Sequence, residues 1–473
     1  MGMSTARRRW ILLIVYFILL FVKELSIEPV HFPPPLPPHG DHKSCVGRLD
    51  SSPFGAGSAR IALCNIGNYA YAAYVKIGTP GYGVWLEIDT GSADTWFMTS
   101  DCSSPTCLLR KRFNVRNSSM SLEKLGRTFN LTYGPGILVQ GHVVTDRLCL
   151  AKDACLGNRT LGVVQRISQS LMYSDGVLGL GFGSLARLGH RDSSLLPELM
   201  TVDSSRSKNY PARPVFGLRL RRNTPNSEEG DGGELTIGYV NRTIRGPVLL
   251  GIPLAIHNSG YWMTTMSQFE LQYFCEESLP DSFCNDNRIV PLVTDARNGA
   301  KAIFDTGSTY ILSSSQKLQL ELDRWLQNGW VESNKEHLVT NCRQLRNLPT
   351  LRFSFCSTIN CTHFVVTTLS PQQYTFPLGL DSCRRRVGVQ YIAGLPFTVF
   401  GTTFLSNFHT TFDFGEKRVE LEPLSFKESN MESSLGTNVT LNRAEIPGRD
   451  QPVDGFLACL ATIVAAVLLT PLR

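Results

Sequence analysis

Short hydrophobic runs, broken by Gly, Pro, Asn and Ser, follow one another along the chain from about Tyr69 onward. Typical runs are YAAYVKIG, GVWLEID, FNLTYG and GILVQGHVV. Turn-bounded runs of this length favour β-strands. Helical spacing appears mainly in residues 313–330, where Leu318, Leu320, Leu322 and Trp325 fall in an amphipathic segment. The pattern therefore predicts an all-β chain, mainly β with short helices.

A hydrophobic segment near the N-terminus has a different character. Residues 10–22 are all apolar and follow the basic triplet at 7–9, which is typical of a secretory signal. We interpret residues 1–26 as a signal peptide, with an uncleaved anchor as the alternative because no small-residue cleavage pattern follows. Residues 27–68 include HFPPPLPPH and are interpreted as a Pro-rich N-terminal segment or short propeptide.

The C-terminus ends in a second apolar segment, residues 456–472, with only Arg473 after it. Small residues around 442–444, a polar spacer and this tail fit a GPI-attachment signal, which we place at 443–473 and expect to be removed. Ser433, Ser434 and Gly436 are rival attachment regions, and a single-pass tail anchor is the alternative. Residues 425–442 are interpreted as a Ser/Thr-rich stalk.

Charge and glycosylation motifs narrow the functional class. The net charge of +6, from 46 basic and 40 acidic residues, is too mild and too dispersed for a nucleic-acid binder. Sequons support a glycosylated ectodomain, because they coincide with a signal at one end and an anchor at the other. They lie at Asn117, Asn130, Asn158, Asn241, Asn360 and Asn438.

The strongest motif is a tetrapeptide that occurs twice, at Asp89–Ser92 and at Asp305–Ser308. Each copy follows a hydrophobic strand, and each is followed at nearly the same spacing by an apolar-apolar-Gly element, at 177–179 and at 399–401. Two halves in the same order indicate a duplicated lobe.

Paired carboxylates have a specific chemistry. Two of them close together across a lobe interface cannot both ionise, so they share one proton and titrate as a pair. The ionised member can take a proton from a trapped water while the protonated member polarises a carbonyl group. The glycines permit close backbone approach, and the Thr and Ser hydroxyls can orient the carboxylates.

These segments resemble the pepsin-like aspartic endopeptidases. IGTPGYGVWLEIDTGSADTW is similar to the first catalytic strand and turn of that family, and KAIFDTGSTYIL to the second. The resemblance covers about Tyr69 to Pro423. It implies a bilobal pepsin-like fold, with lobes at 69–245 and 246–424, an active cleft between them, and Asp89 and Asp305 as the catalytic pair.

The resemblance also assigns supporting roles. Tyr133 and Gly134 stand where the family has its flap, a hairpin that closes over substrate, and Trp96 stands where the flap tyrosine finds its hydrogen-bond partner. Pro135 departs from the usual flap sequence and removes a backbone donor. Residues matching the network that holds the two carboxylates are Thr90, Gly91, Ser92, Thr306, Gly307 and Ser308.

The 13 cysteines are an odd number for a paired extracellular protein. Cys459 lies inside the apolar tail, so its removal leaves an even number. The resemblance suggests Cys102–Cys107 and Cys342–Cys383, with Cys356–Cys361 nested inside the latter. Local guesses are Cys45–Cys64, Cys149–Cys155 and Cys275–Cys284.

The sequence thus predicts a monomeric aspartic endopeptidase on the extracellular side of the plasma membrane or in a cell wall, tethered to the membrane by a GPI anchor. It resembles the fungal GPI-anchored, yapsin-like members of the family. Polypeptides are its expected substrates, with no nucleic-acid partner. No cofactor or metal is expected, since HExxH is absent and the nine histidines are scattered. The alternative is a catalytically silent binding protein on the same fold that recognises a glycan or a protein.

Overall fold

Strands dominate the computed structural model, and the all-β fold class with short helices is confirmed. The structure describes residues 45, 47, 49–50, 58–115, 122–134, 136–152, 154–168, 174–189, 195, 214–223, 231–240, 250–255, 259–273, 288–293, 299–334, 337–358, 360–378, 381–424 and 439–443. The predicted signal peptide and the predicted GPI signal beyond Arg443 lie outside these residues.

The largest sheet has 13 strands in the order β11-β25-β24-β9-β10-β1-β2-β3-β8-β4-β7-β6-β5. Its strands are β1 (Ala59–Ile66), β2 (Ala70–Ile77), β3 (Tyr82–Asp89), β4 (Thr95–Met98), β5 (Glu123–Tyr133), β6 (Ile137–Cys149), β7 (Cys155–Ile167), β8 (Gly176–Gly179), β9 (Val215–Leu220), β10 (Asp231–Ile237), β11 (Leu250–Pro253), β24 (Phe408–Asp413) and β25 (Arg418–Pro423). The four hydrophobic runs named above fall in β2, β3, β5 and β6, as predicted.

A second sheet has nine strands, eight of them in the order β22-β15-β23-β14-β12-β18-β19-β26, with β13 paired to β12. Its strands are β12 (Met263–Gln272), β13 (Ile289–Val293), β14 (Ala300–Phe304), β15 (Ile311–Ser313), β18 (Thr350–Cys356), β19 (His363–Leu369), β22 (Val389–Tyr391), β23 (Thr398–Phe400) and β26 (Val439–Arg443). A four-stranded sheet contains β16 (Glu332–Asn334), β17 (His337–Asn341), β21 (Asp381–Val387) and β20 (Thr375–Leu378).

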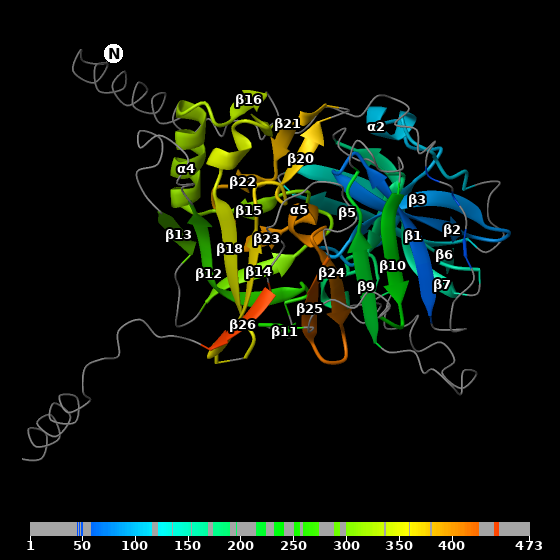
Figure 1. Cartoon of the computed structure of the whole chain (residues 1–473). Helices are drawn as coiled ribbons and strands as arrows, with labels where there is room; N and C mark the ends of the chain where they lie inside the picture. Colours follow the sequence, from blue (N-terminus) through cyan, green and yellow to red (C-terminus); the bar gives the residue numbers. More distant parts are fainter. Residues whose placement is uncertain are drawn as a thin grey trace, which may run out of the picture.

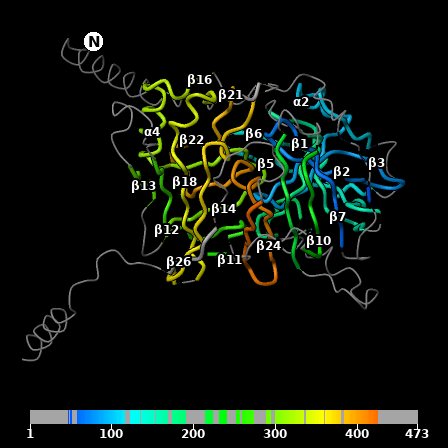
Figure 2. Tube along the Cα trace, viewed as in Figure 1, coloured from blue at the N-terminus to red at the C-terminus, as the bar shows by residue number. Residues whose placement is uncertain are grey.

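Elements from the two halves of the chain form two bodies side by side (Figure 1). The last strands cross back, because β24 pairs with β9 and places Phe412 opposite Phe216, with ring centroids 4.6 Å apart. Trp262, fully buried, packs against both rings. In the trace of Figure 2 the orange segment of β24 lies next to green segments of the first half, and the sheet order places β9 between β24 and β10. One cluster of buried apolar side chains, with members from both halves, therefore joins them.

Each half contains the same three-stranded unit. In the first, β8 lies between β3, to which it is parallel, and β4, to which it is antiparallel. In the second, β23 lies between β14 and β15 with the same directions. The duplication read from the tetrapeptides is therefore present in the strand connections.

The helices are α2 (Pro105–Leu108), α4 (Gln316–Gln327) and α5 (Thr402–Leu405), with 3-10 turns η2 (Gly183–Leu185) and η3 (Leu345–Asn347). α4 confirms the predicted helix, and Leu318, Leu322 and Trp325 are buried. Leu320, in contrast, is 65% exposed. Two positions along a helix turn a side chain to the far side, so Leu320 cannot share a face with Leu318.

Two segments extend the folded body beyond the predicted lobe limits. Strand β1 begins at Ala59, within the range 27–68 interpreted as an N-terminal segment. Strand β26 pairs antiparallel with β19 and so adds the end of the predicted stalk to the edge of a sheet. None of the described helices is long and apolar enough to cross a bilayer.

Five of the suggested cysteine pairs are joined in the structure; Cys275, Cys284 and Cys459 lie outside the described residues. The bonds are Cys45–Cys64, Cys102–Cys107, Cys149–Cys155, Cys342–Cys383 and Cys356–Cys361. Among the sequons, Asn130, Asn158 and Asn360 are exposed, whereas Asn117, Asn241 and Asn438 lie outside the described residues.

The two faces of α4 predict different costs for the same substitution. Leu318→Ala should lower the free energy of unfolding by about 2–5 kcal/mol, because it opens a cavity beneath the helix. Leu320→Ala should change it by less than about 0.5 kcal/mol, because that side chain lies in solvent. Denaturant unfolding of both variants measures the difference. Equal costs would contradict the orientation of the helix.

Candidate active site

The two repeated aspartates occupy equivalent positions in the two halves. Asp89 is the last residue of β3, and Asp305 follows the last residue of β14. The backbone of each is fixed by the neighbouring parallel strand: Leu180 N–H donates to Asp89 O at 2.7 Å, and Asp305 N–H donates to Phe400 O at 3.1 Å. The strands of the sheet therefore fix the backbone position from which each carboxylate side chain extends.

The apolar-apolar-Gly elements have a steric reason. A Cβ on Gly179 would lie 2.4 Å from the backbone of Ala93, and a Cβ on Gly401 would lie 2.4 Å from the carbonyl oxygen of Ser308. Each aspartate turn thus passes directly over the glycine of its own half. Any larger residue would push the turn away from the sheet.

Both carboxylates receive the same set of hydrogen bonds. The Oδ1 of Asp89 accepts from Gly91 N–H at 2.8 Å, and its Oδ2 accepts from the Ser92 hydroxyl. The Oδ1 of Asp305 accepts from Gly307 N–H at 2.9 Å, and its Oδ2 accepts from the Ser308 hydroxyl at 2.7 Å. These bonds hold the two carboxylates in matching orientations.

Each turn also lies against the carboxylate of the other half. A Cβ on Gly91 would lie 2.5 Å from Asp305 Oδ1, and a Cβ on Gly307 would lie 2.5 Å from Asp89 Oδ1. Glycine at both positions allows this approach. The structure therefore brings Asp89 and Asp305 together as a pair.

Two threonines lock the turns to each other. The Thr90 hydroxyl donates to Phe304 O at 2.8 Å and accepts from Thr306 N–H at 2.9 Å. The Thr306 hydroxyl donates to Ile88 O at 2.7 Å and accepts from Thr90 N–H at 3.0 Å. All four bonds are buried and join residues more than 200 positions apart.

The pair is poised to share a proton. Burial raises the pKa of Asp89 well above its usual range, and the negative charge of Asp305 raises it further. Bonds from Ser92 and Gly91 oppose the rise. An arrangement with one ionised and one protonated carboxyl can take a proton from water and supply one to an oxygen or nitrogen atom of a substrate.

Glu87 is a third acidic residue at the site, and the sequence reasoning missed it. It lies two positions before Asp89 on β3, and alternate residues of a strand share a face. Burial and the charges of Asp89 and Asp305 raise the pKa of Glu87 to about 8. The corresponding residue of the second half is apolar, Ile303. The signal was present in the period-two spacing of Glu87 and Asp89.

The predicted flap residues lie beside the first aspartate turn. Tyr133 ends β5, and its hydroxyl accepts a hydrogen bond from Trp96 Nε1–H at 2.7 Å. Burial and the Asp89 charge raise the pKa of Tyr133, so it stays protonated. Gly134 and Gly136 both have positive φ, at 45° and 113°. Pro135 between them lies outside the described residues.

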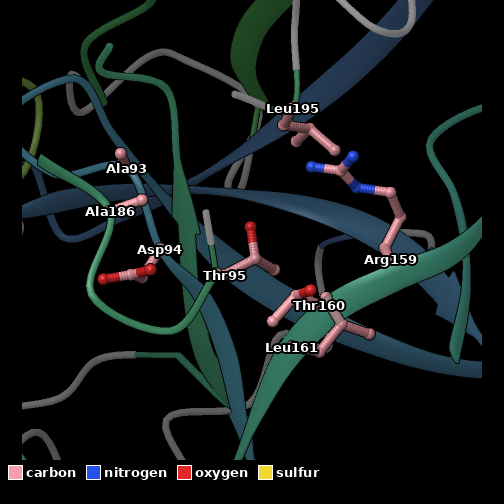
Figure 3. A pocket seen from close by; sticks show the side chains of 9 residues that line it. Ala93, Asp94, Thr95, Arg159, Thr160, Leu161, Ala186 and Leu195 are labelled. Carbon is pink, nitrogen blue, oxygen red and sulfur yellow. The ribbon is translucent and has the colours of Figure 1, made fainter. Parts of the chain in front are cut away.

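A small pocket is lined by Ala93, Asp94 and Thr95, which directly follow the first aspartate turn in the sequence (Figure 3). Its lining includes Asp94, whose carboxylate accepts hydrogen bonds from the backbone N–H groups of Arg187 and Leu188. Neither Asp89 nor Asp305 lines it, so it is separate from the paired carboxylates. Among the described residues, no cluster of three His, Cys, Asp or Glu side chains is placed to hold a metal ion.

Comparisons with known proteins agree with this geometry. The family described as "Eukaryotic aspartyl protease" matches residues 70–424. Cathepsin E of Oryctolagus cuniculus is 26% identical over 377 residues, which cover 77% of this chain and 83% of the relative. Cathepsin E-A of Xenopus laevis is 29% identical over 339 residues (70% and 74%), and gastricsin of Mus musculus is 26% identical over 342 residues (70% and 75%).

The raised pKa of Glu87 predicts a pH-dependent contribution to stability. A carboxyl group whose pKa is higher in the folded state than in the unfolded state contributes to the free energy of unfolding. This contribution is complete at a pH below the unfolded pKa, and it is lost as the pH rises through the folded pKa, here about 8. The free energy of unfolding of the wild type should therefore fall relative to Glu87→Gln as pH rises, by at most about 1.4 kcal/mol per pH unit.

Denaturant unfolding from pH 5 to 8.5 measures this difference, with the exposed Glu332→Gln as a matched control. Parallel pH profiles for the wild type and Glu87→Gln would contradict the raised pKa.

Proposed function

The chain belongs to the eukaryotic aspartyl protease family, and from this premise we propose that Asp89 and Asp305 are the carboxylates with which it hydrolyses peptide bonds. The protein is an aspartic-type endopeptidase, a hydrolase whose substrates are polypeptides. The observation that carries the assignment is the reciprocal approach of the two turns, in which Gly91 lies against Asp305 and Gly307 lies against Asp89.

The proposed reaction needs one proton on the pair and one water molecule. The ionised carboxylate takes a proton from the water molecule. At the same time the water oxygen attacks the carbonyl carbon of the peptide bond. The protonated carboxyl donates to the carbonyl oxygen, which gives a neutral tetrahedral intermediate. Proton transfer to the amide nitrogen then lets the C–N bond break. Aspartic proteases are the reference case of two carboxylates sharing one proton, so this scheme is the chemistry of the family.

The surrounding residues support this chemistry in two ways. Ser92 and Ser308 hold the outer carboxylate oxygens, so the inner oxygens are left to share the proton. The flap supplies the cover: Tyr133, fixed by Trp96, stands where closure of the β5–β6 hairpin would exclude water from bound substrate. The bond to Trp96 orders the tyrosine before substrate arrives.

A catalytically silent binding protein is the competing proposal. Such a protein has no need for two complete carboxylate networks, since binding a glycan or a protein does not require a shared proton. Here both aspartates, both glycines and both serines are present and make matching hydrogen bonds. The matched networks favour the enzyme.

Neutralising either member of the pair should abolish hydrolysis. Asp89→Asn and Asp305→Asn keep the shape of the side chain but remove the proton acceptor or donor, so kcat should fall by at least about 1000-fold. A casein or haemoglobin digestion assay across pH, with and without pepstatin, measures the loss. Asp101→Asn, at an exposed position, is the matched control. Substantial activity in either active-site variant would contradict the mechanism.

We also propose that the enzyme is secreted and held at the cell surface by a GPI anchor. The apolar segments at both ends and the exposed sequons at Asn130, Asn158 and Asn360 support this location. The narrower likeness to fungal yapsin-like members remains a proposal.

A phospholipase that cleaves GPI anchors should release the active enzyme from intact cells. Because Cys459 would leave with the attachment signal, the released enzyme should contain no free thiol. Retention at the membrane after phospholipase treatment would favour a transmembrane tail.

A further inference from the structure

Arg386 is a buried cation at the boundary between the two halves. It lies on β21, is 1% exposed, and stacks its guanidinium over the ring of Tyr69 at 3.6 Å from the centroid. The rings of Phe376 and Tyr310 lie at 5.1 and 5.6 Å. Three aromatic side chains, one from the first half and two from the second, thus surround one guanidinium.

The contacts of Arg386 reach the turn between β1 and β2. Its Nη2 donates to Asn68 O at 3.0 Å, across 318 positions of sequence. Together with the stacking on Tyr69, this bond holds two consecutive residues of the first half. A planar guanidinium suits this role, because it can stack and donate at the same time.

The same turn is also held from the second catalytic loop. Thr309, which follows the Asp305–Ser308 tetrapeptide, donates from its hydroxyl to Tyr69 O at 2.8 Å. Its own carbonyl oxygen accepts from the Thr403 hydroxyl at 2.7 Å, so α5 fixes it from the other side. Arg386, Tyr69 and Thr309 therefore form a continuous path to the loop that carries Asp305.

Arg386 has no carboxylate partner among the described residues, and its Nε makes no hydrogen bond there. Burying an unpaired charge is costly, and a well-packed apolar residue of similar size often serves stability equally well. Stability alone therefore does not account for an arginine at this position.

We propose that Arg386 is a positioning residue of the catalytic pair. By holding Asn68 and Tyr69 against Thr309, it fixes the second aspartate turn relative to the first and keeps Asp305 close to Asp89. This inference rests on the proposed catalytic roles of the two aspartates. It adds a further tie between the halves, independent of the bonds between Thr90 and Thr306.

Other titratable groups surround both ends of this path. Glu87 and Tyr133 face the aspartate pair from β3 and β5. Around Arg386 lie Tyr69, Tyr310 and Tyr71, with the cation Arg222. His337 lies near it too, and burial together with the Arg386 charge lowers the pKa of its imidazole to about 4. A test must separate a change in the position of the aspartates from the loss of the Arg386 charge, because removing one cation changes the electrostatic potential at all of these groups.

The pH profile of kcat/KM reports the spacing of the pair. Two carboxylates in close contact titrate far apart, and the separation shrinks as they move away from each other. Arg386→Met fills the same space without charge. It should fold, lower kcat about tenfold with little change in KM, and narrow the bell-shaped profile by about one pH unit.

Arg385→Met is the matched control. Arg385 is the neighbouring residue on β21, and its hydrogen bonds stay within the second half, at Thr375 and Gln372. This control removes one positive charge from a neighbouring position, so its pH profile of kcat/KM should keep the wild-type width. Arg386→Lys keeps the charge but loses the planar stack, and it should narrow the bell to a smaller extent.

The outcomes are distinct. The proposal would be overturned if Arg386→Met had the wild-type kcat and a pH profile of kcat/KM as wide as that of the wild type. If the methionine variant does not fold, the same result in Arg386→Lys would overturn it. Equal narrowing in Arg385→Met would also overturn it, because charge alone would then explain the change. Failure of the catalytic assignment would show differently, as full activity in Asp305→Asn.

Discussion

Two carboxylates that approach each other closely cannot both be charged, and this constraint governs the whole molecule. Asp89 and Asp305 come from strands more than 200 residues apart, so the fold must carry them together against their repulsion. One shared proton relieves the repulsion and also creates the acid and the base that amide hydrolysis needs. The close approach of the two carboxylates is therefore both the source of their repulsion and the basis of the catalysis.

The surrounding structure supplies the force that keeps the pair together. Parallel strands fix both aspartate backbones, glycines at 179 and 401 let each turn pass over its sheet, and Thr90 and Thr306 bind each turn to the strand of the other half. The crossing strands β24 and β25 join the two halves through a common aromatic core. Every one of these devices acts on the distance between two carboxylates.

Local patterns predicted much of this arrangement. The twin tetrapeptides, the apolar-apolar-Gly elements and the turn-bounded runs marked the duplicated unit, because each depends on neighbouring residues alone. Leu320 shows that an apolar residue in a helical segment need not be buried, since helical geometry placed its side chain in solvent. Glu87 was visible in the alternation of β3. Arg386 was not: nothing near it in sequence indicates Asn68 or Tyr69, and only the fold brings these residues together.

The shared proton can be observed directly by carbon-13 NMR of labelled aspartate carboxyl groups during a pH titration. The account predicts that the signals of Asp89 and Asp305 move together in two steps, one at low pH and one raised. In Asp305→Asn, Asp89 should titrate in a single step at a lower pH than the raised step, because the neighbouring charge is gone. Two independent single steps in the wild type, with Asp89 unchanged in Asp305→Asn, would contradict it.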